Sequence, residues 1–161
     1  MNKWFTVKVK YTKQLDNGTF KRVSEPYLLS AHTFTDAEAR IYEELGSIIR
    51  GEFEVVSITR TEIQDIFGYD DADMWWKCKV KYDASEEESD KRKPTTHDFL
   101  VTAETAKEAY IRIQESLKGL LVDFTVSSIA DSKLIDIFPA KLNLDKELSR
   151  TPIQEYEDDR V

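Results

Sequence analysis

W-F-T-V-K-V-K-Y at residues 4–11 returns later in the chain as W-W-K-C-K-V-K-Y at residues 75–82. Apolar and polar side chains alternate in both copies, as they do in a β-strand with one buried side and one side facing solvent. The offset from Trp4 to Trp75 is 71 residues, and offsets of 71 or 72 relate the strands and the helix that follow. The sequence therefore predicts a tandem duplication.

The first copy continues with a hairpin. Asn17-Gly18 predicts a type I′ turn, because this turn needs two residues with positive φ. The return strand covers residues 19–31 and is expected to be broken at Ser24-Glu25-Pro26. Since proline cannot donate a hydrogen bond to a ladder, we expect an edge position or a bulge near Pro26.

A helix and two further segments complete the copy. Thr33 and Asp36 form a capping-box pattern, and apolar residues at helical spacing extend from Phe34 to Ile48. Residues 53–58 predict a strand in the interior of the sheet, since apolar residues occupy both of its faces. Residues 61–67 fit either a short strand or one helical turn. The second copy repeats the capping box at Thr105–Glu108 and the apolar segment at Asp136–Phe138.

These patterns predict an α+β fold, in which a ββαβ unit is duplicated and one helix per repeat packs on one face of antiparallel sheet. Whether the repeats share one sheet stays open. A charged loop over residues 83–96, expected to be mobile, replaces the tight first hairpin in the second copy. The expected organisation is a first repeat at 1–69, an acidic linker at 70–74, a second repeat at 75–140, and a short helix with an acidic disordered tail at 141–161.

Several of these motifs resemble a protein family. W-F-T-V-K-V-K-Y, E-P-Y-L, F-T-D-A-E-A-R, G-E-F-E-V and D-I-F, with their downstream echoes, are similar to an uncharacterised family of unknown function from Bacteroidetes and their tailed phages. The resemblance covers about residues 4–138. It implies a bacterial or phage protein of the cytoplasm, and it implies no catalytic residues.

The charge is unevenly distributed along the chain. A formal charge of -8 over 161 residues argues against a protein that coats duplex DNA with its whole surface. Residues 1–24 nevertheless carry six basic residues and one acid, whereas residues 25–74 carry twelve acids and three arginines. A local basic strip therefore remains compatible with the acidic total.

The remaining composition indicates an intracellular protein without a metal or cofactor. Cys78 is the single cysteine and cannot form an internal disulfide, and no apolar run is long enough for a membrane span or a signal peptide. We expect a bacterial or infected-host cytoplasm. His32 and His97 lack the spacing of a metal site, so neither a metal nor a cofactor is expected.

A row of tryptophan and lysine side chains is the main candidate for function. If the apolar side of each first strand packs under its helix, the polar side faces outward and offers aromatic rings for stacking and ammonium groups for phosphates. This predicts single-stranded nucleic acid binding, with DNA or RNA left open. The candidate residues are Trp4, Lys8, Lys10, Trp75, Lys77, Lys79 and Lys81.

Other interpretations compete with this one. The tryptophans can be ordinary cross-strand packing partners, with the lysines keeping the outer face soluble. Alternatively, the protein is an acidic interaction module that binds a host or replication protein through the first helix or the tail. The helix residues are Asp36, Glu38, Glu43 and Glu44, and the tail residues are Glu155, Glu157, Asp158 and Asp159. The oligomeric state stays open.

Catalysis is not expected. The sequence has neither a glycine-rich phosphate loop nor a nucleophile elbow. Asp65 and Asp136 recur as a pair of carboxylates, but capping or hydrogen bonding to a neighbouring turn is the simpler role. We expect Cys78 to be a small core residue and His97 to lie in an exposed loop.

Overall fold

The computed structural model describes residues 2–82 and 95–140, and these form two compact units. The first unit contains residues 2–61 and 136–140 of the described chain. The second contains residues 62–82 and 95–135.

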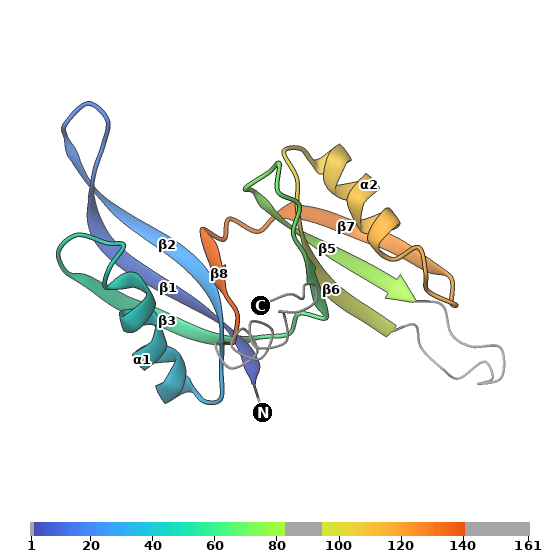
Figure 1. The fold of residues 1–161 in the computed structure, drawn as a ribbon, viewed down its shortest axis with the longest axis horizontal. Coiled ribbons are helices and arrows are strands. Elements are labelled where there is room, and N and C mark those ends of the chain that lie inside the picture. Colours follow the sequence, from blue (N-terminus) through green and yellow to red (C-terminus); the bar gives the residue numbers. More distant parts are fainter. Residues whose placement is uncertain (1, 83–94, 141–161) are drawn as a thin grey trace, which may run out of the picture. The chain divides into compact units, whose positions relative to one another are not determined.

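The first unit is a four-stranded sheet with one helix, drawn in Figure 1. The strand order is β3-β1-β2-β8, in which β1 pairs antiparallel with β2 and β3, and β8 pairs parallel with β2. The elements are β1 Lys3–Gln14, β2 Phe20–Ala31, α1 Phe34–Leu45, β3 Phe53–Thr61 and β8 Asp136–Phe138.

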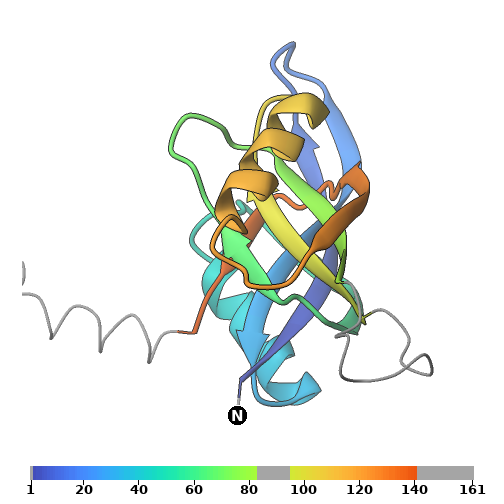
Figure 2. The ribbon, with the colours of Figure 1, turned by 90° about the vertical axis from the view of Figure 1, so that its right-hand side faces the viewer.

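The second unit has the same plan in the order β4-β6-β5-β7, with β4 and β6 parallel. Figure 2 shows α2 lying across one face of this sheet. The predicted α+β fold with a duplicated unit is confirmed, and the repeats have separate sheets. The elements are β4 Asp65–Phe67, β5 Trp75–Tyr82, β6 Thr95–Thr102, α2 Ala106–Ser116 and β7 Phe124–Asp131.

The two repeats exchange their last strands. β4 follows the first repeat along the chain but pairs with β6, and β8 follows the second repeat but pairs with β2. Residues 62–69, which we expected to close the first repeat, therefore belong to the second unit, and so do residues 70–74. Residues 136–140 return to the first unit. Periodicity reports the type of an element but not the strand with which it pairs, which is why the sequence placed both boundaries differently.

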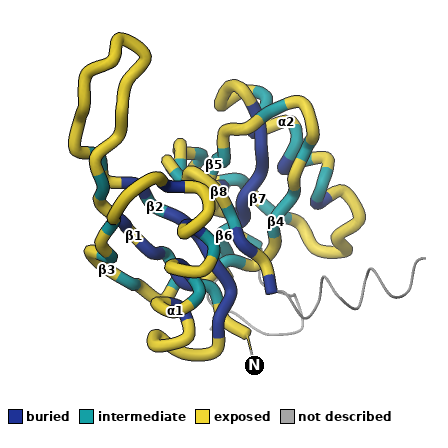
Figure 3. The backbone as a smooth tube through the Cα atoms, turned by 60° about the vertical axis from the view of Figure 1, so that its left-hand side comes forward, coloured by how far each residue is buried: buried dark blue, intermediate teal, exposed yellow. Residues whose placement is uncertain are grey.

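The core of each unit lies between the helix and the apolar side of the sheet. Phe5, Val7 and Val9 are buried in the first unit, and Cys78 and Val80 take the same places in the second. The buried helix positions also correspond. Figure 3 shows the buried residues concentrated in the strands, with the tip of the β1–β2 hairpin exposed. The helix residues are Ala37, Ile41 and Leu45 in α1, and Ala109 and Ile113 in α2.

Both helices begin at the predicted caps. The hydroxyl of Thr33 accepts the backbone N–H of Asp36 at 3.1 Å, and Thr105 accepts that of Glu108 at the same distance. The Glu108 carboxylate accepts the N–H of Glu104, the residue before the cap. Two of the free N–H groups at this helix end are thereby satisfied.

The first hairpin turn differs from the predicted type. Among the described non-glycine residues only Lys133 has a positive φ, so Asn17 does not, and the type I′ prediction is wrong. Gly18 has φ +86 and donates to the carbonyl of Leu15 at 2.9 Å, while Leu15 donates to Thr19. These bonds describe a three-residue loop in which the glycine alone takes the left-handed position.

Further details of the strands and of α1 also differ from the prediction. β2 runs unbroken through Pro26, which directly precedes the residues of β2 that pair with β8 and so lies at an edge, as expected for a residue without an N–H. The irregularity falls between Lys8 and Val9, opposite β3. β3 is an edge strand and not an interior one. α1 ends at Leu45, so that Ile48 is 61% exposed and Ile49 is buried in its place.

Two expectations concern residues outside the described part of the chain. The charged loop was expected at residues 83–96, of which 83–94 are not described, while Thr95 opens β6. The short helix and the acidic tail expected at residues 141–161 also lie outside the described residues.

The sequence of residues 61–67 is compatible with either a short strand or one helical turn. The structure shows that this segment contains the strand β4.

A matched pair of arginines holds the exchanged strands. Arg40 of α1 donates to the carbonyl oxygen of Ser30 at the end of β2, and also to the carbonyl of Pro139, immediately after β8. Arg112 of α2 donates through Nη1 to the carbonyl of Thr102 at the end of β6, and through Nη2 to both carboxylate oxygens of Asp71, four residues after β4. Each arginine thus connects a helix, a long strand and the segment after the exchanged strand.

Replacing Arg112 by Met should loosen β4 selectively, because the side chain keeps its length but loses its donors to Thr102 and Asp71. The amide protons of β4 should exchange with solvent several-fold faster, while those of β5 change little. Lys107→Met, an exposed change on the same helix, is the matched control. Unchanged exchange in β4 of Arg112→Met would show that the arginine does not hold this strand.

Candidate functional site

The predicted lysines lie on the helix-free faces of the two first strands. In β1, Phe5, Val7 and Val9 point into the core, so the alternating Lys8 and Lys10 point away from it and are exposed. In β5, Cys78 and Val80 are buried. The lysines that alternate with these two residues are exposed, and they are Lys77, Lys79 and Lys81.

The tryptophans are less available than the lysines. Trp4 and Trp75 are both half-buried. Trp4 lies opposite the buried Ser30, and the next residue on this face of β2, Leu28, is only 1% exposed. In the second unit Trp75 lies opposite the buried Thr102, and Leu100 is also 1% exposed. The tryptophan end of each helix-free face is therefore largely closed to solvent, and the lysine end is open.

The two lysine rows differ in their acidic neighbours. Asp98 of β6 lies opposite Lys79, and its carboxylate is 3.9 Å from the Lys79 ammonium and 3.6 Å from that of Lys77. Pro26 takes the equivalent position opposite Lys8 in the first unit. The carboxylate of Asp98 therefore offsets part of the positive charge of the second row.

One oxygen of this carboxylate is poorly satisfied. Asp98 Oδ1 is buried and has no hydrogen-bond partner in the described part of the chain, although the Lys79 ammonium lies within ion-pair range. Glu62, Gln64 and His97 line a hollow beside it of about 350 Å³. Asp98 Oδ1 is thus near the Lys79 ammonium but accepts no hydrogen bond from a described residue.

The acidic face of α1 is smaller than the sequence suggests. Glu44 pairs with Arg40 at 3.0 Å, which leaves its carboxylate engaged within the unit. Asp36 and Glu38 are exposed. The predicted tail residues Glu155, Glu157, Asp158 and Asp159 lie outside the described residues.

The recurring aspartates have the structural role that the sequence favoured. Asp65 Oδ1 accepts the N–H of Ile66 at 2.8 Å, and Asp136 Oδ1 accepts that of Ile137 at 2.7 Å. Each aspartate is the first residue of an exchanged strand, β4 or β8, and its carboxylate accepts the N–H of the second residue.

Two other predictions have different outcomes. Cys78 is fully buried in the core, as expected, and burial raises the pKa of its thiol to about 11. His97 is not an exposed loop residue: it lies within β6, is half-buried and packs with its ring centroid 5.2 Å from that of Tyr82.

Sequence reasoning missed a polar cluster in the first unit. Glu25 is 9% exposed, and its Oε1 accepts hydrogen bonds from the hydroxyls of Tyr11 at 2.9 Å and Tyr27 at 3.0 Å. The Lys13 ammonium is 3.7 Å from Oε2. A signal was present in the sequence, because Glu25 shares the inward parity of Tyr27 and Leu29 on β2 and so places a carboxylate where apolar residues belong.

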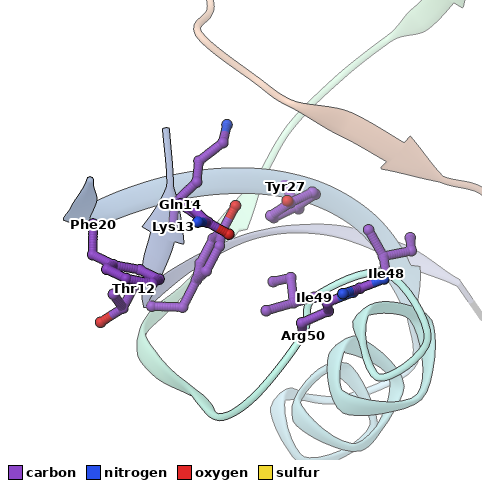
Figure 4. A pocket seen from close by; sticks show the side chains of 9 residues that line it. Thr12, Lys13, Gln14, Phe20, Tyr27, Ile48, Ile49 and Arg50 are labelled. Atoms are coloured by element: carbon purple, nitrogen blue, oxygen red, sulfur yellow. The ribbon is translucent and has the colours of Figure 1, made fainter. Parts of the chain in front are cut away.

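A pocket of about 410 Å³ lies beside this cluster, between the hairpin and the loop after α1. Figure 4 shows Thr12, Gln14 and Phe20 on one side and Ile48 and Arg50 on the other. The remaining lining residues are Tyr11, Lys13, Tyr27 and Ile49. The lining therefore combines tyrosines, apolar side chains and two cations.

Two further findings concern the described residues alone. None of their helices is long and apolar enough to cross a membrane. Residues 2–82 and 95–140 also contain no group of three or more His, Cys, Asp or Glu side chains placed to hold a metal ion.

Comparison with known proteins identifies the family. A model described as "Domain of unknown function (DUF4494)" matches residues 3–140. The chain belongs to this family. The match spans both repeats and both exchanged strands. A search of curated proteins found no match, and a search of solved structures found none either.

The Tyr11–Glu25–Tyr27 cluster should make the protein less stable at high pH. Burial, together with the hydrogen bond to Glu25 and its charge, raises the pKa of Tyr11 to about 12, and the same causes raise the pKa of Tyr27. Unfolded tyrosine ionises near pH 10, so above that pH the unfolded chain binds fewer protons than the folded one. Stability present below pH 10 should therefore decrease as the pH rises towards 12.

The measurement is chemical denaturation at a series of pH values, with tyrosine ionisation followed by ultraviolet absorbance. Glu25→Gln should bring the ionisation of both tyrosines to lower pH, because it removes the negative charge that opposes it. Titration of all tyrosines near pH 10 in the folded wild-type protein would contradict this account.

Proposed function

We propose that this protein binds single-stranded nucleic acid, DNA in the first instance, without enzymatic activity. The supporting observation is that five lysines of two equivalent strands are exposed on faces that their own helices leave uncovered. Ammonium groups along an extended strand suit the phosphates of a flexible backbone. The residues are Lys8, Lys10, Lys77, Lys79 and Lys81.

Phosphate contacts carry more of this proposal than base stacking. Trp4 and Trp75 are half-buried, so each offers only part of a ring to a base. Lys8 and Lys10 have no ion pair with any described residue, whereas Lys77 and Lys79 share Asp98. The first unit is therefore the stronger binding surface, and affinity should depend strongly on salt and weakly on sequence.

The setting that we propose is the cytoplasm of a bacterium of the Bacteroidetes or of a cell infected by one of their tailed phages. This rests on the resemblance of the repeat motifs and is independent of the proposed binding surface. Replication, recombination and repair all expose single strands in such a cell.

Lys8→Gln with Lys10→Gln should weaken binding to an oligothymidylate and reduce its salt dependence. If both lysines contact phosphates, the slope of log affinity against log salt should fall by about 1.4, at about 0.7 for each contact. Binding can be followed by tryptophan fluorescence or anisotropy over a salt series. Lys118→Gln removes an equal charge from the segment that follows α2 and should leave the slope unchanged.

An unchanged slope in the double variant would exclude this surface, and the absence of any salt-sensitive binding by the wild-type protein would exclude the function. If a host protein were then captured from lysate after nuclease treatment, the acidic interaction module would become the better proposal. Its exposed acids Asp36 and Glu38 lie on α1.

Asp98→Asn should strengthen binding to the same oligonucleotide. The substitution keeps the side-chain shape but removes the negative charge beside Lys77 and Lys79, which then become available to phosphates. Affinity should rise and the salt slope should become steeper. Asp123→Asn, before β7, is the control for the change in net charge. Equal effects of the two substitutions would assign the gain to total charge and contradict a role for the second row of lysines.

A further inference from the structure

The duplication provides an internal reference for the polar cluster of the first unit. Val9 lies opposite Glu25, and its counterpart Val80 lies opposite His97. By the same correspondence Tyr27 is replaced by Phe99, which is 2% exposed in the second core. The fold therefore accepts an apolar ring where the first unit has a buried hydroxyl, and it does not require a carboxylate at Glu25.

The buried carboxylate of this cluster costs free energy of folding. A carboxylate withdrawn from water loses solvation that hydrogen bonds only partly restore. Glu25 accepts both tyrosine hydroxyls on the same oxygen, and Lys13 approaches the other oxygen only to 3.7 Å. Departures of this kind from an otherwise consistent core are expected at functional sites.

The pocket beside the cluster has the chemistry of a ligand site. Its volume of about 410 Å³ is within the usual range for small molecules. Tyr11 and Tyr27 form a polar wall whose hydroxyls are oriented by Glu25, while Ile48, Ile49 and Phe20 supply apolar surface. Phe20 is 68% exposed, although an aromatic ring is normally kept from water.

The charge of the side chains that line the pocket indicates which class of ligand it can bind. Lys13 and Arg50 line the pocket, and none of the described residues that line it is acidic. Lys13 is within 3.7 Å of Glu25, whereas Arg50 forms no ion pair with any described residue. In the second unit the position of Arg50 is taken by Val122. The cation, like the hydroxyl of Tyr27, is thus a feature of the first unit alone.

We propose that this pocket binds a small organic carboxylate, with its negative group at Arg50 and its apolar body between Phe20 and the two isoleucines Ile48 and Ile49. The site lies wholly within the first unit and is independent of the lysine faces proposed for nucleic acid. We choose an anion because a cationic ligand would be repelled by the Arg50 guanidinium, whereas the Lys13 ammonium is already close to the Glu25 carboxylate.

The test uses the full chain, labelled with nitrogen-15, and 2-naphthoate as the probe. Titration should produce saturable shifts in the amide resonances of residues 11–14 and 48–50, with the second unit unaffected. The cation 2-naphthylmethylammonium, of similar size, should produce none. Arg50→Val installs the residue of the second unit, and it should raise the dissociation constant for 2-naphthoate about tenfold, as the loss of a charged hydrogen bond implies.

Lys118→Gln removes an equal charge from the second unit and should leave 2-naphthoate binding unchanged. Because Arg50 is exposed, Arg50→Val should retain the wild-type pattern of amide resonances elsewhere, which the same spectra verify. Absence of saturable shifts, equal affinity in Arg50→Val, or equal binding of the cation would each overturn the proposal. Nucleic acid binding should be unaffected by Arg50→Val, so the two proposals can fail separately.

Discussion

The structure depends on two equivalent arginines, each of which joins a helix to its sheet through hydrogen bonds. Arg40 and Arg112 each start from a helix and reach the carbonyl at the end of the central long strand, together with the segment that follows an exchanged three-residue strand. A strand of three residues forms few hydrogen bonds with its neighbour, so the additional hydrogen bonds of the arginine stabilise its position. The same contacts tie each helix to its sheet, and thereby maintain the orientation that leaves one sheet face without a helix.

That helix-free face divides into two parts with different properties. Near the tryptophans, Leu28 and Leu100 are buried, while the exposed lysines lie further along β1 and β5. The nucleic acid binding that we propose for this face therefore relies on charge more than on aromatic surface. The second row of lysines has less net positive charge than the first. Asp98 lies near both Lys77 and Lys79, whereas the first unit has Pro26 at the equivalent position.

The two units differ at polar positions of the first unit that the packing of the second unit does without. Their buried helix and strand positions correspond closely, but Glu25, Tyr27 and Arg50 of the first unit are replaced by His97, Phe99 and Val122. An apolar ring can replace a buried tyrosine at little cost in free energy, whereas a buried carboxylate is costly. This difference between the units is the basis on which we propose a ligand site in the first unit alone.

The duplication, the α+β class, the helix caps and the buried side of each first strand could be predicted from the residues, because they follow from local periodicity and capping chemistry. The exchange of β4 and β8, the edge position of β3, and the partners of Arg40 and Arg112 emerged only from the folded structure, since strand pairing joins residues far apart in the chain. The folded structure also decided which candidate side chains meet water: alternation places Trp4 and Lys8 on the same face, but only the fold buries one end of that face and exposes the other.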